Sequence, residues 1–218
     1  MGDTDAVALL LAALTCGERF AARRARDNVS LAPDEATRKE QQHIAEHEEQ
    51  SYELVSARLA EVGDPHLTER FQPFFQSFHD RCAPSDWVEA QAFHYIGDAL
   101  VSEFGDALVG KLDPVSAEVV TKSLGGREAQ EAFSLDELQR AIDQDPGTRP
   151  RIADYARRIS GEALTQTSRA LEAAAALRDL LGGVQGEKAI LLDLLEAHRV
   201  RLDRLGIDLV EMDDDGGI

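Results

Sequence analysis

The sequence has few of the residues that mark a secreted or membrane-embedded protein. Its 218 residues include only two cysteines, Cys16 and Cys82, which are too few for a disulfide framework and lack the spacing of a metal site. We therefore expect reduced thiols and a cytoplasmic location. No apolar run reaches the ~18 residues that a membrane span requires. The apolar stretch 7–14 follows aspartates instead of a basic region, so it does not have the form of a secretory signal.

Basic residues are also scarce. The chain has 23 lysines and arginines against 41 aspartates and glutamates, which gives a net charge of −18. This charge repels nucleic acid at long range, so nucleic acid is disfavoured as a partner, and we expect no membrane either. Two groups of arginines stand among acids or on predicted helices, and we interpret both as solvated, ion-paired faces: Arg23, Arg24 and Arg26, and Arg149, Arg151, Arg157 and Arg158.

Proline is infrequent, and all of the 7 prolines except Pro73 lie between the periodic segments of the chain or at their ends. Apolar residues recur at helical spacing, and we find no alternation typical of strands. The pattern predicts helices over residues 3–27, 33–62, 66–79, 87–111, 113–142, 152–181 and 187–205. We expect the pair Gly125-Gly126 to kink or loosen its helix and not to end it, because the periodicity resumes at once.

These segments predict an all-α fold. The first, second, fourth and fifth are long and joined by short links, so we expect an antiparallel four-helix bundle with additional C-terminal helices. Because 218 residues suffice for one domain with a substantial core, we assign residues 1–210 to a single helical domain. Residues 211–218 are acidic and rich in glycine, which predicts a flexible tail.

Three carboxylates interrupt the apolar faces of the predicted helices. Glu18 continues the stripe of the first helix, and Asp98 lies on the inward stripe of the fourth. Glu48 lies one turn from Ile44 and one turn from Tyr52, in the middle of an apolar face. An inward carboxylate is costly unless a cation, a proton or several donors meet it. Since bundles that bury carboxylates usually do so to hold metal, these three residues are candidate metal ligands.

The nitrogen ligands of a di-iron bundle are harder to find in this sequence. Such a site combines a carboxylate from each of two helices with a Glu-x-x-His pair from each of the other two. Ser51 stands three residues after Glu48, where a histidine would be needed. The one matching pair, Glu40 with His43, lies about two turns away on a neighbouring face. His94 is the best substitute, because it precedes the candidate Asp98 by four residues and shares its face.

Several segments resemble an actinobacterial family of ferritin-like fold proteins, and the resemblance covers most of residues 8–205. They are residues 16–20, 48–54, 83–87, 95–98, 112–114 and 161–164. That family is distantly similar to the tRNA isopentenyladenosine hydroxylases, which use a di-iron centre. The resemblance therefore implies a ferritin-like bundle, and it implies a di-iron site wherever the ligands are retained.

The resemblance places three carboxylates at ligand positions of the family: Glu18, Glu48 and Asp98. It places Ser51 and Gln130 where the family has histidines, and Arg127 where it has an acidic ligand. A guanidinium at that place would neutralise part of the carboxylate charge and donate up to five hydrogen bonds. It would also compete with divalent ions for the same oxygens.

Two functions are compatible with this pattern. The first is a ferritin-like bundle with a degenerate di-iron site, which binds no cofactor and acts as a binding or interaction protein for an unknown protein or small molecule. The second is a di-iron or mononuclear metal-dependent oxygenase or hydroxylase, which binds iron through a rearranged ligand set with nitrogen from His94, His47 or His43. We favour the first because of Arg127, and whether the chain is an enzyme stays open at this point.

Three further features received a structural interpretation. An alanine-rich face permits close approach of helices and predicts a homodimer: Ala163, Ala170, Ala173, Ala174 and Ala176. An apolar and aromatic group is interpreted as a core patch that closes one end of the bundle and not as a ligand site: Leu67, Phe71, Phe74, Phe75 and Phe78. Three histidines near turns or on the last helix are interpreted as solvated residues: His66, His79 and His198.

Overall fold

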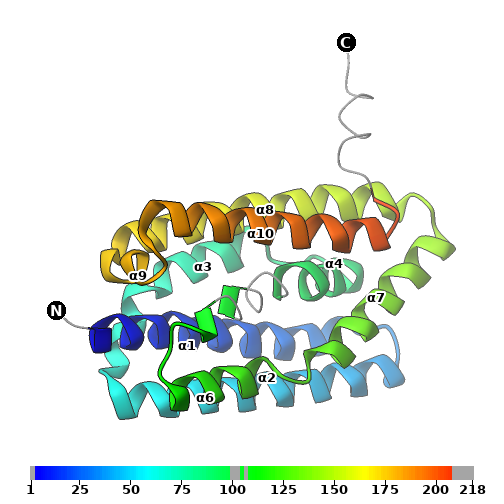
Figure 1. Cartoon of the computed structure of the whole chain (residues 1–218). Helices are drawn as coiled ribbons and strands as arrows, with labels where there is room; N and C mark the ends of the chain where they lie inside the picture. Colours follow the sequence, from blue (N-terminus) through cyan, green and yellow to red (C-terminus); the bar gives the residue numbers. More distant parts are fainter. Residues whose placement is uncertain (1–2, 99–103, 106–107, 208–218) are drawn as a thin grey trace.

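The structure, a computed structural model, describes residues 3–98, 104–105 and 108–207, and every regular element among them is helical (Figure 1). The predicted tail, residues 211–218, lies outside the described residues. The helices are α1 (Asp3–Asn28), η1 (Val29–Leu31), α2 (Glu35–Val62), η2 (Pro65–Arg70), α3 (Gln72–Arg81), α4 (Trp87–Ala92), η3 (Phe93–Asp98), α6 (Pro114–Leu124), α7 (Arg127–Gln144), α8 (Thr148–Ala173), α9 (Ala175–Leu180) and α10 (Gly183–Arg204).

The arrangement confirms the predicted all-α bundle with additional C-terminal helices. Helices α1 and α2 pack along each other in opposite directions, α6 packs on α2, and α4 packs on α7 (Figure 1). On the other side, α8 packs on α3, α4 and η3, and α9 returns to α1. No described helix combines the length and the apolar composition needed to cross a lipid bilayer.

Aspartates fix the starts of three α-helices. The Asp34 side chain accepts a hydrogen bond from the backbone N–H of Thr37, and the threonine hydroxyl oxygen accepts one from the backbone N–H of Asp34. Asp86 and Asp113 accept backbone hydrogen bonds at the starts of α4 and α6 in the same way. Each cap satisfies N–H groups that have no partner inside the helix, which stabilises the helix by about 1 kcal/mol.

Three predicted helices are interrupted in the structure. The segment predicted over 113–142 is two helices, because the extended Gly125 ends α6 and Gly126 adopts a left-handed conformation (φ 79°) before α7 begins. The long helix predicted over 152–181 breaks at Ala174, where the chain turns so that α9 can bury Leu177 and Leu181 against the core around α1. The helix predicted from residue 87 widens into π-helical geometry at Phe93–Asp98, and residues 99–103 and 106–107 of that prediction lie outside the described residues.

Helix α1 is the most enclosed element of the fold. Its residues 8–14 are all buried, so the helix is covered on every side and not only along one stripe. Leu10 and Leu11, both 0% exposed, lie in a core cluster shared with α2, α3 and α9. A second cluster joins η3, α7, α8 and α10. Burying each such leucine contributes about 1.5–3 kcal/mol. A charged side chain on the buried face of α1 therefore enters an environment that excludes water.

The glycine that separates α6 from α7 provides a first test of this description. Gly126→Ala should destabilise the fold by about 1–2 kcal/mol, because a left-handed backbone places Cβ against the following carbonyl. The added Cβ would also lie 3.2 Å from Nε2 of His47 on α2. Urea unfolding followed by circular dichroism measures the change.

Gly161→Ala is the matched control for this substitution. Gly161 lies within α8, and a Cβ there meets no described atom within 4 Å. Replacing it should raise the stability by about 0.5–1 kcal/mol, because glycine is a poor residue inside a helix. Similar effects of the two substitutions would contradict the proposed role of Gly126.

Candidate functional site

The centre of the bundle holds a guanidinium between two glutamates. Glu18 lies in the middle of α1 and Glu48 in the middle of α2, and the two residues are 2% and 1% exposed. Nη2 of Arg127, the first residue of α7, donates to both carboxylate oxygens of Glu18, at 2.9 and 2.8 Å. The same nitrogen lies 3.4 Å from Oε2 of Glu48. The structure therefore brings together these two predicted ligand positions and the arginine.

The third carboxylate, Asp98, lies beside this group with a cation of its own. Arg24 on α1 donates to Oδ1 of Asp98, and Nδ1 of His94 lies 2.6 Å from Oδ2. Because an ionised carboxylate is acceptor-only, His94 must carry its proton on Nδ1. The Arg24 guanidinium also stacks over the ring of Phe93, 3.9 Å from its centroid, which adds a cation–π contact. The π-helical turn of η3 supplies Phe93, His94 and Asp98 together.

Burial and charge act in opposite directions on these carboxyl groups. Burial raises the pKa of Glu18, Arg127 lowers it, and the charges of Glu48 and Asp98 raise it again, with a net value of about 7. Burial would also raise the pKa of Asp98, but Arg24 and the hydrogen bond from His94 outweigh it and lower the pKa to about 2. Asp98 therefore stays ionised at neutral pH, whereas Glu18 is partly protonated.

The excess of carboxylates over guanidinium groups explains this difference. The ion pairs combine three carboxylates with two arginines, so full ionisation would leave one negative charge in the interior. Oε1 of Glu48 is buried without a hydrogen-bond partner among the described residues. The raised pKa of Glu18 identifies this residue as the one that binds the compensating proton near neutral pH. A cavity of about 20 Å³ beside Glu18, Arg24 and Asp98 is large enough for one water molecule.

The other predicted ligand positions do not supply imidazole nitrogen to this centre. Ser51 donates its hydroxyl proton to the carbonyl oxygen of Ser123, 2.9 Å away, and so holds the end of α6 against α2. Gln130 is buried, with Oε1 unpaired among the described residues. His47 packs against Gly126, and His43 is exposed beside Glu46. Within the described residues, no three His, Cys, Asp or Glu side chains are arranged to hold a metal ion.

A di-iron centre does not fit the residues that occupy these positions. Two ferrous or ferric ions need free carboxylate oxygens and imidazole nitrogens around them. Here both oxygens of Glu18 accept from Arg127, and both oxygens of Asp98 accept from Arg24 and His94. The cation of this centre is a guanidinium.

Arg24 is the residue of this site that sequence analysis missed. We interpreted it as part of a solvated face, yet it is only 5% exposed, because its charge is matched by Asp98 and its plane is covered by Phe93. A signal was available in the sequence. Arg24 follows the inward Ala21 by three residues, so it lies on the same face of α1.

Of the three histidines interpreted as solvated, His198 is buried and His79 is half-buried. His198 is 3% exposed, and its Nε2 lies 2.9 Å from the hydroxyl of Ser160. His79 is half-buried, with its ring 5.8 Å from that of Phe20. Only His66 is exposed as expected, and it pairs with Glu69. Helix α10 lies against α8 and thereby encloses His198, a contact that the sequence pattern does not reveal.

Comparison with known proteins adds one result on the family of this chain. The family model described as a ferritin-like domain of actinomycetes matches residues 3–184. No curated protein matches the sequence. The distant similarity to tRNA isopentenyladenosine hydroxylases stays a prediction.

Removing the central guanidinium should destabilise the protein, because the buried carboxylates would lose their compensating charge. Arg127→Ala should lower the free energy of unfolding by about 3–5 kcal/mol, because it leaves the charge of Glu18 and Glu48 uncompensated. Arg26→Ala is the control, since Arg26 pairs with Glu49 at the surface and its side chain is 65% exposed. That change should cost less than about 1 kcal/mol. If urea unfolding showed the same loss of stability for Arg127→Ala and Arg26→Ala, the Arg127 guanidinium would lie outside the core.

The raised pKa of Glu18 predicts a pH dependence with a defined sign. The pKa of Glu18 is about 7 in the folded protein and 4.5 ordinarily, so the folded state binds this proton more tightly than the unfolded state does. The resulting stabilisation is fully present below pH 4.5. This contribution is lost as the pH rises to about 7. In the wild type, the free energy of unfolding should therefore decline by on the order of 1–3 kcal/mol over that range, and Glu18→Gln should remove this decline. Urea unfolding at several pH values measures it.

Asp98→Asn provides the contrasting measurement for this pH dependence. The pKa of Asp98 is lowered to about 2, so its stabilisation is present above pH 4 and is lost as the pH falls toward 2. This substitution should therefore alter the acid limb of the stability profile. If the stability of Glu18→Gln fell with pH in parallel with that of the wild type between pH 4.5 and 7, the assignment of the proton to Glu18 would be wrong.

Proposed function

The chain belongs to the family of actinomycete ferritin-like domains, and from this premise we propose that it is a metal-free binding or interaction protein. The observation that carries the proposal is the contact of Arg127 with both oxygens of Glu18 and one oxygen of Glu48. A bundle that binds metal through these carboxylates would have to expel this cation first. The proposed site is therefore a degenerate di-iron site in which arginine takes the part of the metal.

The proposed role of the ion pairs is structural. Arg127 connects α7 to α1 and α2, and Arg24 connects α1 to η3. A metal ion in a bundle core would join the same helices through its ligands. Arginine does so with a planar array of donors that matches carboxylate oxygens and needs no supply of metal. This assignment leaves the activity of the protein to its binding surfaces and cavities.

A homodimer in the cytoplasm is part of the same proposal, although the alanine face that first indicated a dimer is not one surface. Ala174 is buried, and Ala163 and Ala170 line a cavity. Support comes instead from apolar side chains that α10 exposes to solvent: Val184, Leu192, Leu195 and Val200. Sedimentation at micromolar concentration should give twice the chain mass of 23.9 kDa, and a monomer would contradict the dimer.

Metal analysis of the purified protein tests the proposed function. Protein produced with excess iron and manganese should contain far less than one equivalent of either metal, because the carboxylate oxygens are taken by arginine. The triple variant Arg127→Glu, Ser51→His and Gln130→His is the positive control and should gain metal. Stoichiometric iron in the wild type that is lost in Glu18→Gln would overturn the proposal and support a metal-dependent oxygenase instead.

A further inference from the structure

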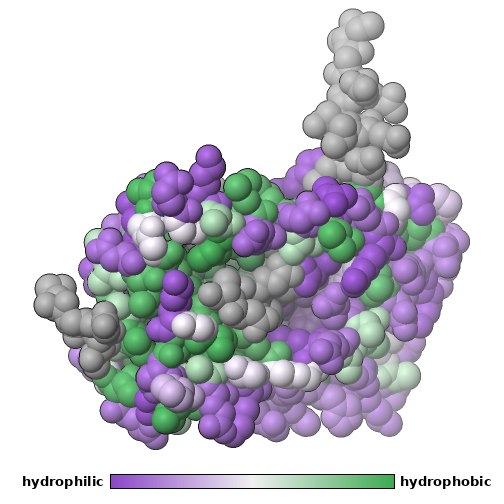
Figure 2. Space-filling view, viewed as in Figure 1, coloured by the Kyte–Doolittle hydropathy of each residue, from purple (hydrophilic) through white to green (hydrophobic). Residues whose placement is uncertain are grey.

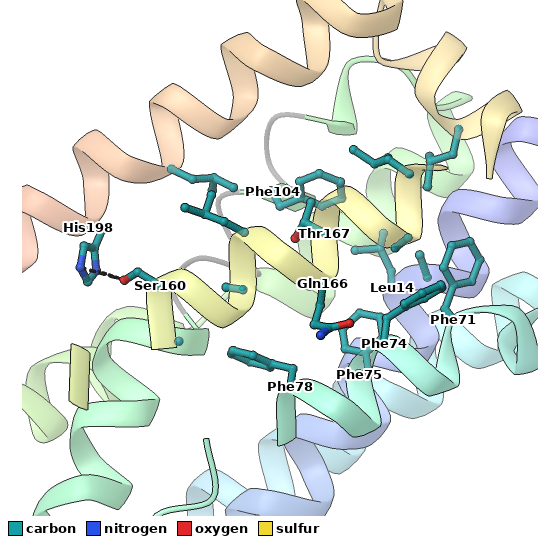
Figure 3. Close-up of a pocket in the computed structure, with 18 of the residues that line it drawn as sticks. Leu14, Phe71, Phe74, Phe75, Phe78, Phe104, Ser160, Gln166, Thr167 and His198 are labelled. Atoms are coloured by element: carbon teal, nitrogen blue, oxygen red, sulfur yellow. Dashed lines mark hydrogen bonds between the residues drawn. The ribbon is translucent and has the colours of Figure 1, made fainter. Parts of the chain in front are cut away.

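A second recess, lined mainly by apolar and aromatic side chains, lies apart from the carboxylates. It is a cavity of about 120 Å³ between α3, α8, α9 and α10, with Leu14 of α1 at its base (Figure 3). Phe71, Phe74, Phe75 and Phe78 line one side. Sequence analysis interpreted these rings as a core patch, but only Phe71 is fully buried, and the other three are partly open to the cavity.

The cavity reaches the surface on an apolar side of the molecule. Leu195 of α10 lines it and is 41% exposed. Figure 2 shows apolar side chains gathered where α1, α9 and α10 approach one another. The opposite wall is α8, which contributes small residues, Ala163 and Ala170, where larger ones would fill the space. Leu195 therefore connects the cavity to the apolar surface of α10, and α8 forms another of its walls.

The polar groups of the cavity are few and uncharged. No Asp, Glu, Lys or Arg is among the described residues that line it. His198 lies at one end, bonded to Ser160 (Figure 3). Burial, followed by the charge of Arg201, lowers the pKa of His198 to about 4, so the ring is neutral at pH 7. The hydroxyl of Thr167 lies on the wall and has no hydrogen bond to another described residue.

We propose that this cavity binds a small neutral aromatic molecule, about the size of one substituted benzene ring. A dry cavity of about 150 Å³ lined by Leu, Ile and Phe is known to bind benzene, so about 120 Å³ of similar lining suits a ligand of this size. The phenylalanine rings favour an aromatic ligand through offset or edge-to-face contacts. One hydroxyl on the ligand can bond to Thr167, whereas a carboxylate would lose its hydration without gaining a cation.

The inference rests on the proposed function in one respect, namely that the protein acts by binding. Its evidence is independent of the ion pairs, because the cavity and the carboxylate centre share only the rings of Phe75 and Phe78 in their walls. Metal analysis and ligand binding therefore fail separately. If the purified protein contains no metal and binds no aromatic ligand, the proposed function stands and this inference is wrong.

Calorimetric titration with three probes tests the chemistry of the ligand. Toluene and benzyl alcohol should bind to the wild-type protein at pH 7, and benzoate should bind at least tenfold more weakly, because it differs mainly in charge. Thr167→Val should weaken benzyl alcohol about fivefold and leave toluene unchanged, as expected for one hydrogen bond. Binding of benzoate as tight as that of benzyl alcohol, or no binding of either neutral probe, would overturn the proposal.

A cavity-filling substitution tests the location. Ala163→Leu places a larger side chain into the cavity and should abolish binding of toluene. Ala173→Leu is the matched control, because Ala173 is an exposed alanine of the same helix, and it should bind toluene as the wild type does. Retained binding in a folded Ala163→Leu variant would overturn the proposed site.

Methyl NMR of the wild type decides the location even if Ala163→Leu does not fold. Toluene should shift the leucine methyl signals of the cavity wall, including Leu14, Leu171 and Leu194. The methyl signals of Leu54, which is 42% exposed on α2, should not move. Shifts confined to surface leucines, with the cavity leucines unchanged, would show that the ligand binds elsewhere.

Discussion

Three carboxylates on the inner sides of α1, α2 and η3 can remain in the bundle only if positive charge reaches them. An unpaired ion in an environment that excludes water costs several kcal/mol, and three like charges close together raise that cost. Arg24 and Arg127 provide two positive charges, and a proton near neutral pH provides most of the rest. The positions of α7 and η3 depend on this balance, because each element delivers one member of an ion pair.

The backbone irregularities of the fold occur where these charges must be delivered. Helix α6 ends at the extended Gly125, and the left-handed Gly126 turns the chain so that α7 begins with Arg127 directed at Glu18. The π-helical turn at Phe93–Asp98 presents a stacking ring, an imidazole and a carboxylate to Arg24 within six residues. Irregular helical turns are common where a site needs groups that a regular helix would spread over different faces. The same logic applies here, with guanidinium groups as the cations.

Sequence periodicity could predict much of the fold and the three carboxylates of the charge network, Glu18, Glu48 and Asp98. The interruptions of the apolar stripes by Glu18 and Glu48 predicted buried acids, and the family resemblance directed attention to Arg127. Arg24 was missed, because an arginine in a basic cluster is usually solvated, and only the contact with Asp98 shows otherwise. The break at Ala174 was missed for a similar reason, since alanine favours helix and packing of α9 on α1 overrides that preference.

The cavity could not be predicted from the sequence, because a phenylalanine that lines a hollow and one that fills a core show the same spacing. What separates them is the size of the residues on the facing helix, and α8 places alanines there. Phe75 and Phe78 form the boundary between this hollow and the carboxylate centre. An anionic ligand would thus meet two obstacles. It would find no cation among the described residues that line the cavity, and it would lie near a centre whose carboxylates outnumber its arginines. The charge balance of the bundle core therefore also restricts what the neighbouring cavity can accept, and it favours neutral molecules.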